Sequence, residues 1–291
     1  MVGVFEVFEL PFVQRGVWEV LLLAVGAGLI GTWVVLRGLA FYAHAVGTAT
    51  FPGLVLADGL GFAATLGAAG TGLLVALGVG ALGRQAARSG RDAERHDATT
   101  ALVLCGALAI GVLLASDVFG SAASVETLLF GSLLVIDDGD LVLAGVTSAV
   151  VLLATVLLEP RWLATGFDPA SARALGVRSA LPDVLLLALV GLVALSVLSA
   201  VGALLATALI VVPAATTRLL VRRVRAWQVA TVLLVAVEGV AGLWLSVETN
   251  APPGATIAVL SGGAFVLAAL LRAGLRRGVV RARPLPEVAR A

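Results

Sequence analysis

Long apolar runs are the feature of this 291-residue chain that most restricts its fold. Nine such runs occur, each close to the roughly 17 to 25 residues that a helix needs to cross about 30 Å of hydrocarbon. They are Val17–Leu36, Leu39–Ala57, Phe62–Leu82, Thr99–Ala115, Leu141–Leu158, Val184–Ala200, Ala203–Leu219, Trp227–Val247 and Ala255–Leu271. The pattern predicts an all-α integral membrane protein, a polytopic bundle of about nine transmembrane helices.

The composition excludes a soluble domain. Hydrophobic residues make up 60% of the chain and charged residues 13%, and the mean hydropathy is +1.09, which leaves too little polar surface to face water. A single cysteine, Cys105, forms no internal disulfide, and two histidines are too few for a structural zinc cluster. The net charge of +1 gives no indication of a nucleic-acid partner.

The positive charges predict the orientation of the chain in the membrane. All nineteen are arginines, and when the apolar runs alternate across the membrane eighteen of them fall on one side, with Arg15 alone opposite. Because arginine-rich loops resist translocation, the crowded side is the cytoplasm. We therefore expect a bacterial cytoplasmic (inner) membrane protein with its N-terminus outside, a transmembrane domain at residues 1–278 and a cytoplasmic tail at 279–291.

Prolines predict breaks in the apolar helices. Pro52-Gly53 interrupts the second run, Pro213 interrupts the seventh, and Pro252-Pro253-Gly254 fills the outer turn before the last. A proline inside a span removes a backbone hydrogen bond that lipid does not replace, so a broken helix is expected where protein or a wet cavity supplies the partner. Transporters use such breaks around substrate pathways, and packing kinks without a functional role are the alternative.

The segment Asp117–Asp140 between the fourth and fifth runs is acidic and has no positive residue. Its apolar stretch Val125–Ile136 is too short to cross as a helix, which predicts a segment on the outer face that lies against the bundle. The acidity would either concentrate cations or serve as solvated loop charge. Glu19 and Asp58 fall at the outer ends of their spans, where they would line an entrance or be hydrated.

Two cytoplasmic segments carry helix signals. Around Phe167–Val177, Asp168 suits a helix cap, Pro169 the first helical position and Gly176 the end of the helix. The segment Leu209–Arg225 is predicted to leave the membrane as a basic amphipathic helix. Such a helix often serves to anchor to anionic lipid.

Seven short motifs follow one another along nearly the whole chain. They are Pro11-Phe12-Val13-Gln14-Arg15, Gly31–Phe41, Phe51-Pro52-Gly53, Leu129–Leu134, Phe167-Asp168-Pro169 with Ala174-Leu175-Gly176, Val212–Leu220 and Ala251–Gly254. In this order they resemble the metal-ion branch of ATP-binding-cassette importer permeases, the family that moves zinc, manganese or ferrous iron inward. The resemblance implies the type II importer permease fold.

The resemblance also implies partners. Importers of this type contain two permease subunits, two cytoplasmic ATPase subunits and an extracytoplasmic metal-binding protein. This sequence has no G-x-x-x-x-G-K-[ST] phosphate loop, so ATP hydrolysis would occur on a separate subunit and this chain would be a transport subunit without a bound cofactor. By the resemblance, the ATPase-coupling residues are Pro213, Ala214, Ala215, Thr216, Thr217, Arg218, Arg222, Arg223 and Arg225.

The expected metal site departs from the family pattern. Members carry an Asp and a His four residues apart just before the Pro-Gly, a spacing that puts two metal ligands on one helical face. Aligned on Arg37 and Pro52-Gly53, these positions are His44 and Thr48 here. Imidazole suits zinc and other borderline metals, so the sequence favours zinc, with manganese or iron as alternatives. Pro52 and Gly53 would form a hinge in the pathway.

Depth in the membrane gives an independent reason to single out three residues. At 1.5 Å per helical residue, His44 lies about 10 Å and Thr48 about 16 Å from Arg37, while Glu238 lies about 16 Å from Trp227. Ionisable groups at such depth are costly unless they face a partner or water. His44, Thr48 and Glu238 are therefore the candidate pathway residues, although a packed neutral histidine and a protonated interior carboxyl are the structural alternatives.

Two other function classes stay open at this stage. A permease for a metal chelate such as a siderophore shares the broad architecture, but the metal-branch motifs argue against it. A secondary transporter driven by an ion gradient would use Glu238 as its proton carrier, and the docking motif Pro213–Leu220 argues against that.

Overall fold

The computed structural model describes residues 6–88, 93–118, 129–132, 136–174, 176, 180–203 and 205–281, and every element assigned within these ranges is helical. Two of them are unusual, a 3-10 helix (η1) and a π-helix (η2). In chain order the elements are η1 (Glu6–Glu9), α1 (Pro11–Leu36), α2 (Ala40–Leu60), α3 (Ala64–Arg88), α4 (Ala93–Leu113), η2 (Leu114–Val118), α6 (Asp138–Phe167), α7 (Pro169–Ala174), α8 (Ala180–Ser196), α9 (Leu198–Val201), α10 (Ala206–Leu220), α11 (Val224–Thr249) and α12 (Pro253–Arg281).

The predicted spans fall on these helices. By length and composition, six helices of the described chain are able to cross a membrane: α1, α2, the end of α4 with η2, α6, α11 and α12. Three shorter apolar helical stretches, Ala64–Val75, Leu181–Ser196 and Ala206–Leu220, cover the remaining predicted runs. The all-α membrane fold is thus confirmed.

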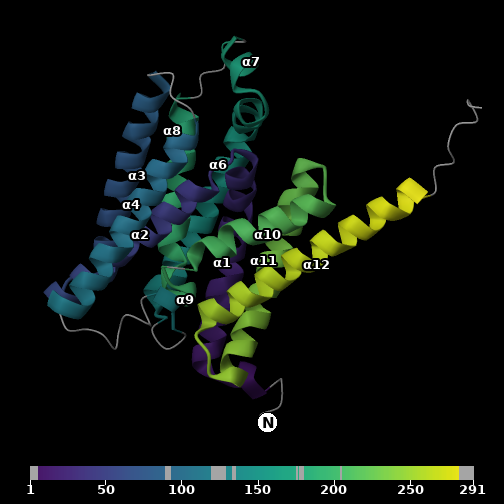
Figure 1. Ribbon diagram of the computed structural model, residues 1–291. Helices are drawn as coiled ribbons and strands as arrows, with labels where there is room; N and C mark the ends of the chain where they lie inside the picture. The colour runs from purple at the N-terminus through teal and green to yellow at the C-terminus, as the bar shows by residue number, and fades with distance from the viewer. Residues whose placement is uncertain are drawn as a thin grey trace, which may run out of the picture.

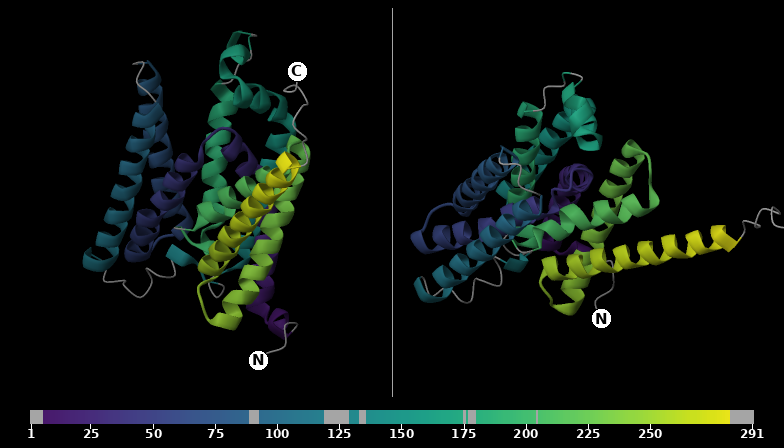
Figure 2. Two further views of the ribbon diagram at one scale, coloured as in Figure 1. Left: turned by 45° about the vertical axis from the view of Figure 1, so that its right-hand side comes forward. Right: turned by 45° about the horizontal axis from the view of Figure 1, so that its top comes forward.

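The helices form two groups around α1. Helix α1 packs against α6, α10 and α11, whereas α2 packs against α3, α4 and α8. Figure 1 shows α2, α3 and α4 on one side of α1 and the green and yellow helices α10, α11 and α12 on the other. The left view of Figure 2 shows the purple start of α1 near the bottom of the bundle and the yellow far end of α12 in its upper half.

Local chemistry explains where several helices begin and end. Pro11 occupies the first turn of α1, where its missing N–H costs nothing. Asp137 and Asp140 form a reciprocal capping box that starts α6, with hydrogen bonds of 2.9 and 3.0 Å. Helix α11 ends at Thr249 and is capped by Asn250, which adopts the left-handed conformation at φ 52°.

Small residues allow the helices to cross closely. A Cβ atom added to Gly31 would lie 2.0 Å from the Ile210 carbonyl oxygen, so α1 and α10 touch backbone to backbone. A Cβ on Gly53 would lie 2.1 Å from the Gly67 oxygen, which brings α2 equally close to α3. In lipid, where apolar burial gives helices little drive to associate, such contacts are a main source of packing energy.

The prediction that Pro52-Gly53 and Pro213 interrupt their helices is wrong. Helix α2 continues through Pro52 and α10 continues through Pro213. Both prolines are buried, and the neighbouring helices hold the chain in place although one backbone hydrogen bond is missing. Whether Pro52 and Gly53 serve as a hinge stays a prediction.

The broken helix lies between α8 and α10 instead. The chain turns at Val197, forms the short α9 and then passes through Gly202 at φ 83°. A Cβ on Gly202 would lie 2.3 Å from the Leu129 carbonyl oxygen, and one on Gly254 would lie 2.0 Å from that of Val201. Residues 129–132 therefore lie against the bundle, as predicted for this acidic segment; residues 119–128 and 133–135, with Glu126, lie outside the described residues.

The predicted short helix after Gly166 is confirmed as α7. Its cap is Asp168, whose Oδ1 accepts the Ser171 N–H at 3.0 Å. At the C-terminus, α12 extends to Arg281, three residues past the predicted boundary between residues 278 and 279. The rest of the predicted tail lies outside the described residues.

Candidate functional site

His44 and Thr48 lie four residues apart on one face of α2, as the sequence predicts. His44 is half-buried, and Thr48 is buried with 1% of its surface exposed. The Thr48 hydroxyl has no hydrogen-bond partner among the described residues. A buried hydroxyl without a partner is uncommon, because desolvation without a compensating hydrogen bond is costly.

The partner of His44 comes from α10. The Nδ1 atom of His44 lies 3.0 Å from the Thr207 Oγ1 atom, across 163 residues of sequence. Between His44 and Thr48, Gly47 faces the same region, since a Cβ there would lie 3.7 Å from the Ala203 oxygen and 3.8 Å from Thr207 Oγ1. The histidine face of α2 thus looks onto the first turn of α10. Nothing in the sequence pattern singled out Thr207.

Glu238 belongs to another interface. Its Oε2 atom accepts a hydrogen bond from the Ser261 hydroxyl of α12, and its Oε1 atom has no partner among the described residues. Helix α11 packs against α1, α10 and α12. No hydrogen bond or ion pair joins Glu238 to His44 or Thr48 in the described part of the chain. The hypothesis that the Glu238 carboxylate replaces the missing aspartate beside His44 is therefore not supported by any described hydrogen bond or ion pair.

The α2 face offers few ligands for a metal ion. Among the described residues, no three His, Cys, Asp or Glu side chains come together as a potential metal site. A resident zinc site in proteins usually has three or four protein ligands. One imidazole beside hydroxyl groups is better suited to bind an ion transiently during transport than to hold a resident ion.

An apolar cavity lies on the opposite face of α2. It has a volume of about 260 Å³ and is lined by small and aliphatic residues of α2, α3 and α8, including Val46, Thr50 and Gly191. None of the predicted pathway residues lines it. Thr50 is the one polar residue among the described lining side chains of this cavity, which has no charged or imidazole ligand for an ion.

Glu19 departs from its predicted exposure. It is fully buried within α1, and neither carboxylate oxygen has a hydrogen-bond partner among the described residues. Helix α6 packs against α1 and carries Asp138, which forms an ion pair with Arg15 of α1 at 3.3 Å. Asp58, by contrast, is exposed as expected.

The predicted coupling segment is not one basic helix. Helix α10 ends at Leu220, residues 221–223 form a turn, and α11 begins at Val224. The turn is fixed by Trp227, whose Nε1–H donates to the Ala214 oxygen at 2.8 Å and whose ring lies 4.8 Å from the Arg218 guanidinium carbon. The two helices therefore form a hairpin.

Only part of this hairpin is accessible. Pro213, Ala214, Thr216 and Thr217 are buried, and Ala215 and Arg218 are half-buried. Three arginines of the predicted set are exposed: Arg222, Arg223 and Arg225. A partner on this side would meet these three side chains first.

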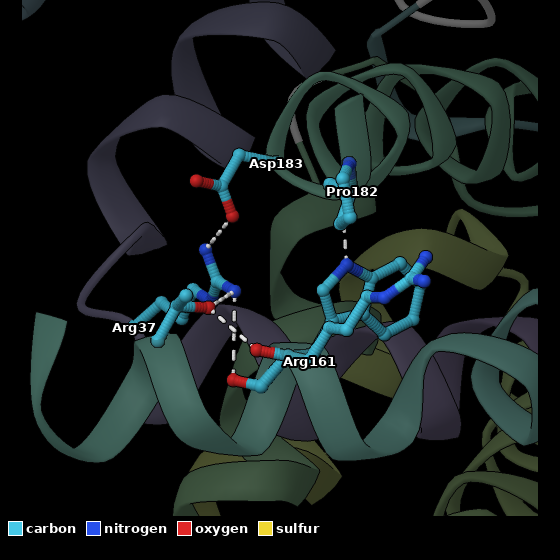
Figure 3. Close-up of polar contacts among 6 residues, drawn as sticks. Arg37, Arg161, Pro182 and Asp183 are labelled. Carbon is cyan, nitrogen blue, oxygen red and sulfur yellow. Dashed lines mark hydrogen bonds and ion pairs between the residues drawn. The ribbon is translucent and has the colours of Figure 1, made fainter. Parts of the chain in front are cut away.

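Arg37 ends α1 inside a polar cluster that the sequence did not predict. Its Nη1 atom donates to Asp183 Oδ1 at 2.6 Å, and its Nη2 atom donates to Thr165 Oγ1 and to the Trp162 carbonyl. Figure 3 shows the guanidinium between Asp183 at the start of α8 and the backbone of α6. The Trp162 Nε1–H donates to the Pro182 oxygen at 2.9 Å, so the cluster ties α1, α6 and α8 together.

The fold and these sites define a class, the multi-span membrane permease. The chain belongs to the ABC 3 transport family, whose family model matches residues 9–272.

Two relatives and one solved structure illustrate the similarity. The chain is 28% identical over 264 residues to the manganese transport system membrane protein MntC of Halalkalibacterium halodurans, which covers 90% of this chain and 88% of that protein. It is 26% identical over 263 residues to the probable iron transport system membrane protein of Haemophilus influenzae, with coverage of 90% and 94%. The structure of PsaBC from Streptococcus pneumoniae in complex with Fab matches with a TM-score of 0.79 at 25% identity, over 91% of this chain and 94% of that one.

Proposed function

We propose that this chain is the transmembrane permease subunit of an ATP-driven importer of divalent transition-metal ions. The observation that carries the proposal is the polar face of α2, where His44 contacts Thr207 and the buried Thr48 hydroxyl has no partner among the described residues. A lipid-embedded helix keeps such groups when they serve a substrate pathway. Membership of the ABC 3 transport family and the names of its relatives support a metal as the substrate.

The ligand chemistry favours zinc among these metals. Imidazole nitrogen suits zinc and other borderline ions, and among the described residues no carboxylates gather with His44 into the kind of cluster that hard ions prefer. Manganese is the second candidate, because a relative that spans most of the chain is a manganese transport protein. Iron is the third candidate, because another relative is a probable iron transport protein.

The importer requires partners that supply energy and substrate. A cytoplasmic ATPase would dock on the α10–α11 hairpin, whose exposed Arg222, Arg223 and Arg225 offer positive charge. An extracytoplasmic metal-binding protein would deliver the ion to the opposite end of a permease homodimer. In this proposal the N-terminus lies outside the cytoplasmic membrane and the C-terminus inside.

Reconstitution tests the function. The permease, its ATPase and its binding protein are placed in liposomes, and ATP hydrolysis is measured with the binding protein loaded with zinc, manganese or iron in turn. We expect stimulation by a loaded binding protein, strongest with zinc. Stimulation by manganese alone would replace zinc as the substrate, and equal hydrolysis with empty and loaded binding protein would contradict the proposal.

Charge reversal tests the docking surface. We expect Arg222→Glu with Arg223→Glu to abolish copurification of the ATPase while the permease stays folded, since both side chains are exposed. Arg15→Glu is the matched control. Arg15 is also exposed, but it lies near the N-terminal end of α1 and not on the α10–α11 hairpin. Normal copurification in the double variant would exclude this surface.

A further inference from the structure

His44 has two ring nitrogens, and the structure engages only one of them. Nδ1 faces Thr207 Oγ1 at 3.0 Å, while no partner of Nε2 is found among the described residues. A neutral imidazole carries one proton, and only the nitrogen without that proton binds a metal. The partner of Nδ1 therefore decides whether Nε2 is able to act as a ligand.

The Thr207 hydroxyl both donates and accepts hydrogen bonds. When it accepts from a protonated Nδ1, the lone pair of Nε2 is free for an ion. When it donates to Nδ1, the proton sits on Nε2 and blocks coordination. Metal-binding histidines in proteins almost always donate their other ring N–H to an oxygen, which fixes both the tautomer and the ring orientation.

We infer that Thr207 is a positioning residue that accepts a hydrogen bond from Nδ1 of His44 and so presents Nε2 to the transported ion. The inference rests on the proposed function, because it needs His44 to contact the ion. Thr207 itself acts through the histidine, and its hydroxyl does not have to reach the metal.

The place of Thr207 in the fold supports this role. It lies in the first turn of α10, directly after the break at Gly202, and the same helix leads to the arginine hairpin at its other end. At 1.5 Å per residue, Thr207 lies about 20 Å from Leu220 along α10. A displacement of α10 at the hairpin would therefore act on the hydrogen bond that orients His44.

The tautomer is directly measurable. The chain has two histidines, His44 and His96, so ¹⁵N-histidine labelling gives two imidazole signals, and His96→Ala assigns them. Above the histidine pKa, we expect His44 in the Nδ1–H form in the wild type and a shift toward the Nε2–H form, which free histidine prefers, in Thr207→Val. An Nε2–H signal in the wild type, or no change in Thr207→Val, would overturn the inference.

Metal uptake by the Thr207 variants is the second test of the inference. At subsaturating zinc or manganese, we expect Thr207→Val to lower uptake by about 10- to 100-fold, the usual cost of removing the partner of a metal-binding histidine. Thr207→Ser keeps the hydroxyl and should retain most of the uptake, at the same membrane abundance. If His44→Ala is inactive but Thr207→Val transports normally, Thr207 has no positioning role; if His44→Ala itself transports normally, the proposed site on α2 fails instead.

Discussion

The two polar regions that involve α1 and α2 differ in how completely their groups are bonded. At the end of α1, the Arg37 guanidinium donates to a carboxylate, a hydroxyl and a carbonyl from two other helices. On α2, within the described part of the chain, His44 has one partner and Thr48 has none. The Arg37 guanidinium is bonded through both Nη atoms, although its buried Nε atom has no partner among the described residues, and these bonds hold three helices together. A polar face whose groups have fewer partners is suited to a ligand.

Breaking the bonded cluster should have the largest effect on stability. Arg37→Met removes a charge-assisted hydrogen bond to Asp183, and bonds of this kind contribute about 1.5 to 3 kcal/mol. We expect the detergent-solubilised protein to melt at a clearly lower temperature and to accumulate less in membranes. Arg15→Met is the control, because the Arg15–Asp138 pair is 52% and 84% exposed and such pairs contribute about 1 kcal/mol or less. Equal melting temperatures for the two variants would refute the assignment of Arg37 to the fold.

Trp162 extends the same cluster and should matter somewhat less. Its buried ring lies 5.3 Å from that of Trp33, and its N–H satisfies the Pro182 carbonyl. Trp162→Phe keeps an aromatic ring but leaves that carbonyl unpaired, at a cost of about 1 to 3 kcal/mol. Thermal melts check this, and uptake per folded molecule should be unchanged. A selective loss of uptake would show that the cluster also belongs to the pathway.

Glu238 is intermediate between these two regions, because one carboxylate oxygen accepts a hydrogen bond and the other has no partner among the described residues. Glu238→Gln preserves size and still accepts the Ser261 hydroxyl, so we expect little change in folded abundance. As a candidate pathway residue it should lower metal uptake, but less than His44→Ala, because no hydrogen bond or ion pair in the described part of the chain joins it to His44 or Thr48. Wild-type uptake would remove Glu238 from the pathway, and a loss of abundance alone would make it structural.

The smallest stability effect is expected at Arg225. Its pair with Glu159 spans 3.5 Å, and the arginine side chain is 87% exposed, so solvent screens the interaction. Arg225→Ala should change stability by less than about 1 kcal/mol while weakening ATPase copurification. A large drop in melting temperature would mean that the hairpin is held by this pair and not by Trp227.

The sequence predicted the helices well, because few backbone conformations satisfy all backbone hydrogen bonds within lipid. Each predicted apolar run coincides with described helix, and the cap at Asp168 follows from local chemistry. Pro52 and Pro213 misled the prediction, since burial among neighbouring helices decides whether a proline ends a helix. Whether a proline is buried among neighbouring helices depends on tertiary packing, which the local sequence does not give.

The site was predicted only in part for the same reason. The position of His44 before Pro52-Gly53 marked it, but Thr207 is 163 residues away and looks like any other threonine in an apolar run. Arg37 and Asp183 are separated by 146 residues, and each alone reads as a charge at a helix end. Such partners emerge only when the helices are packed.

The most direct test of the account is metal uptake per folded permease in proteoliposomes that contain the complete transporter. The account predicts that His44→Ala loses ATP-dependent uptake of zinc, and of manganese if it is carried, by more than about 100-fold, beyond the cost of losing a supporting residue. Its melting temperature should stay close to that of the wild type, because His44 makes one hydrogen bond within the described part of the chain. Wild-type uptake by His44→Ala would contradict the central claim that the polar face of α2 carries the ion.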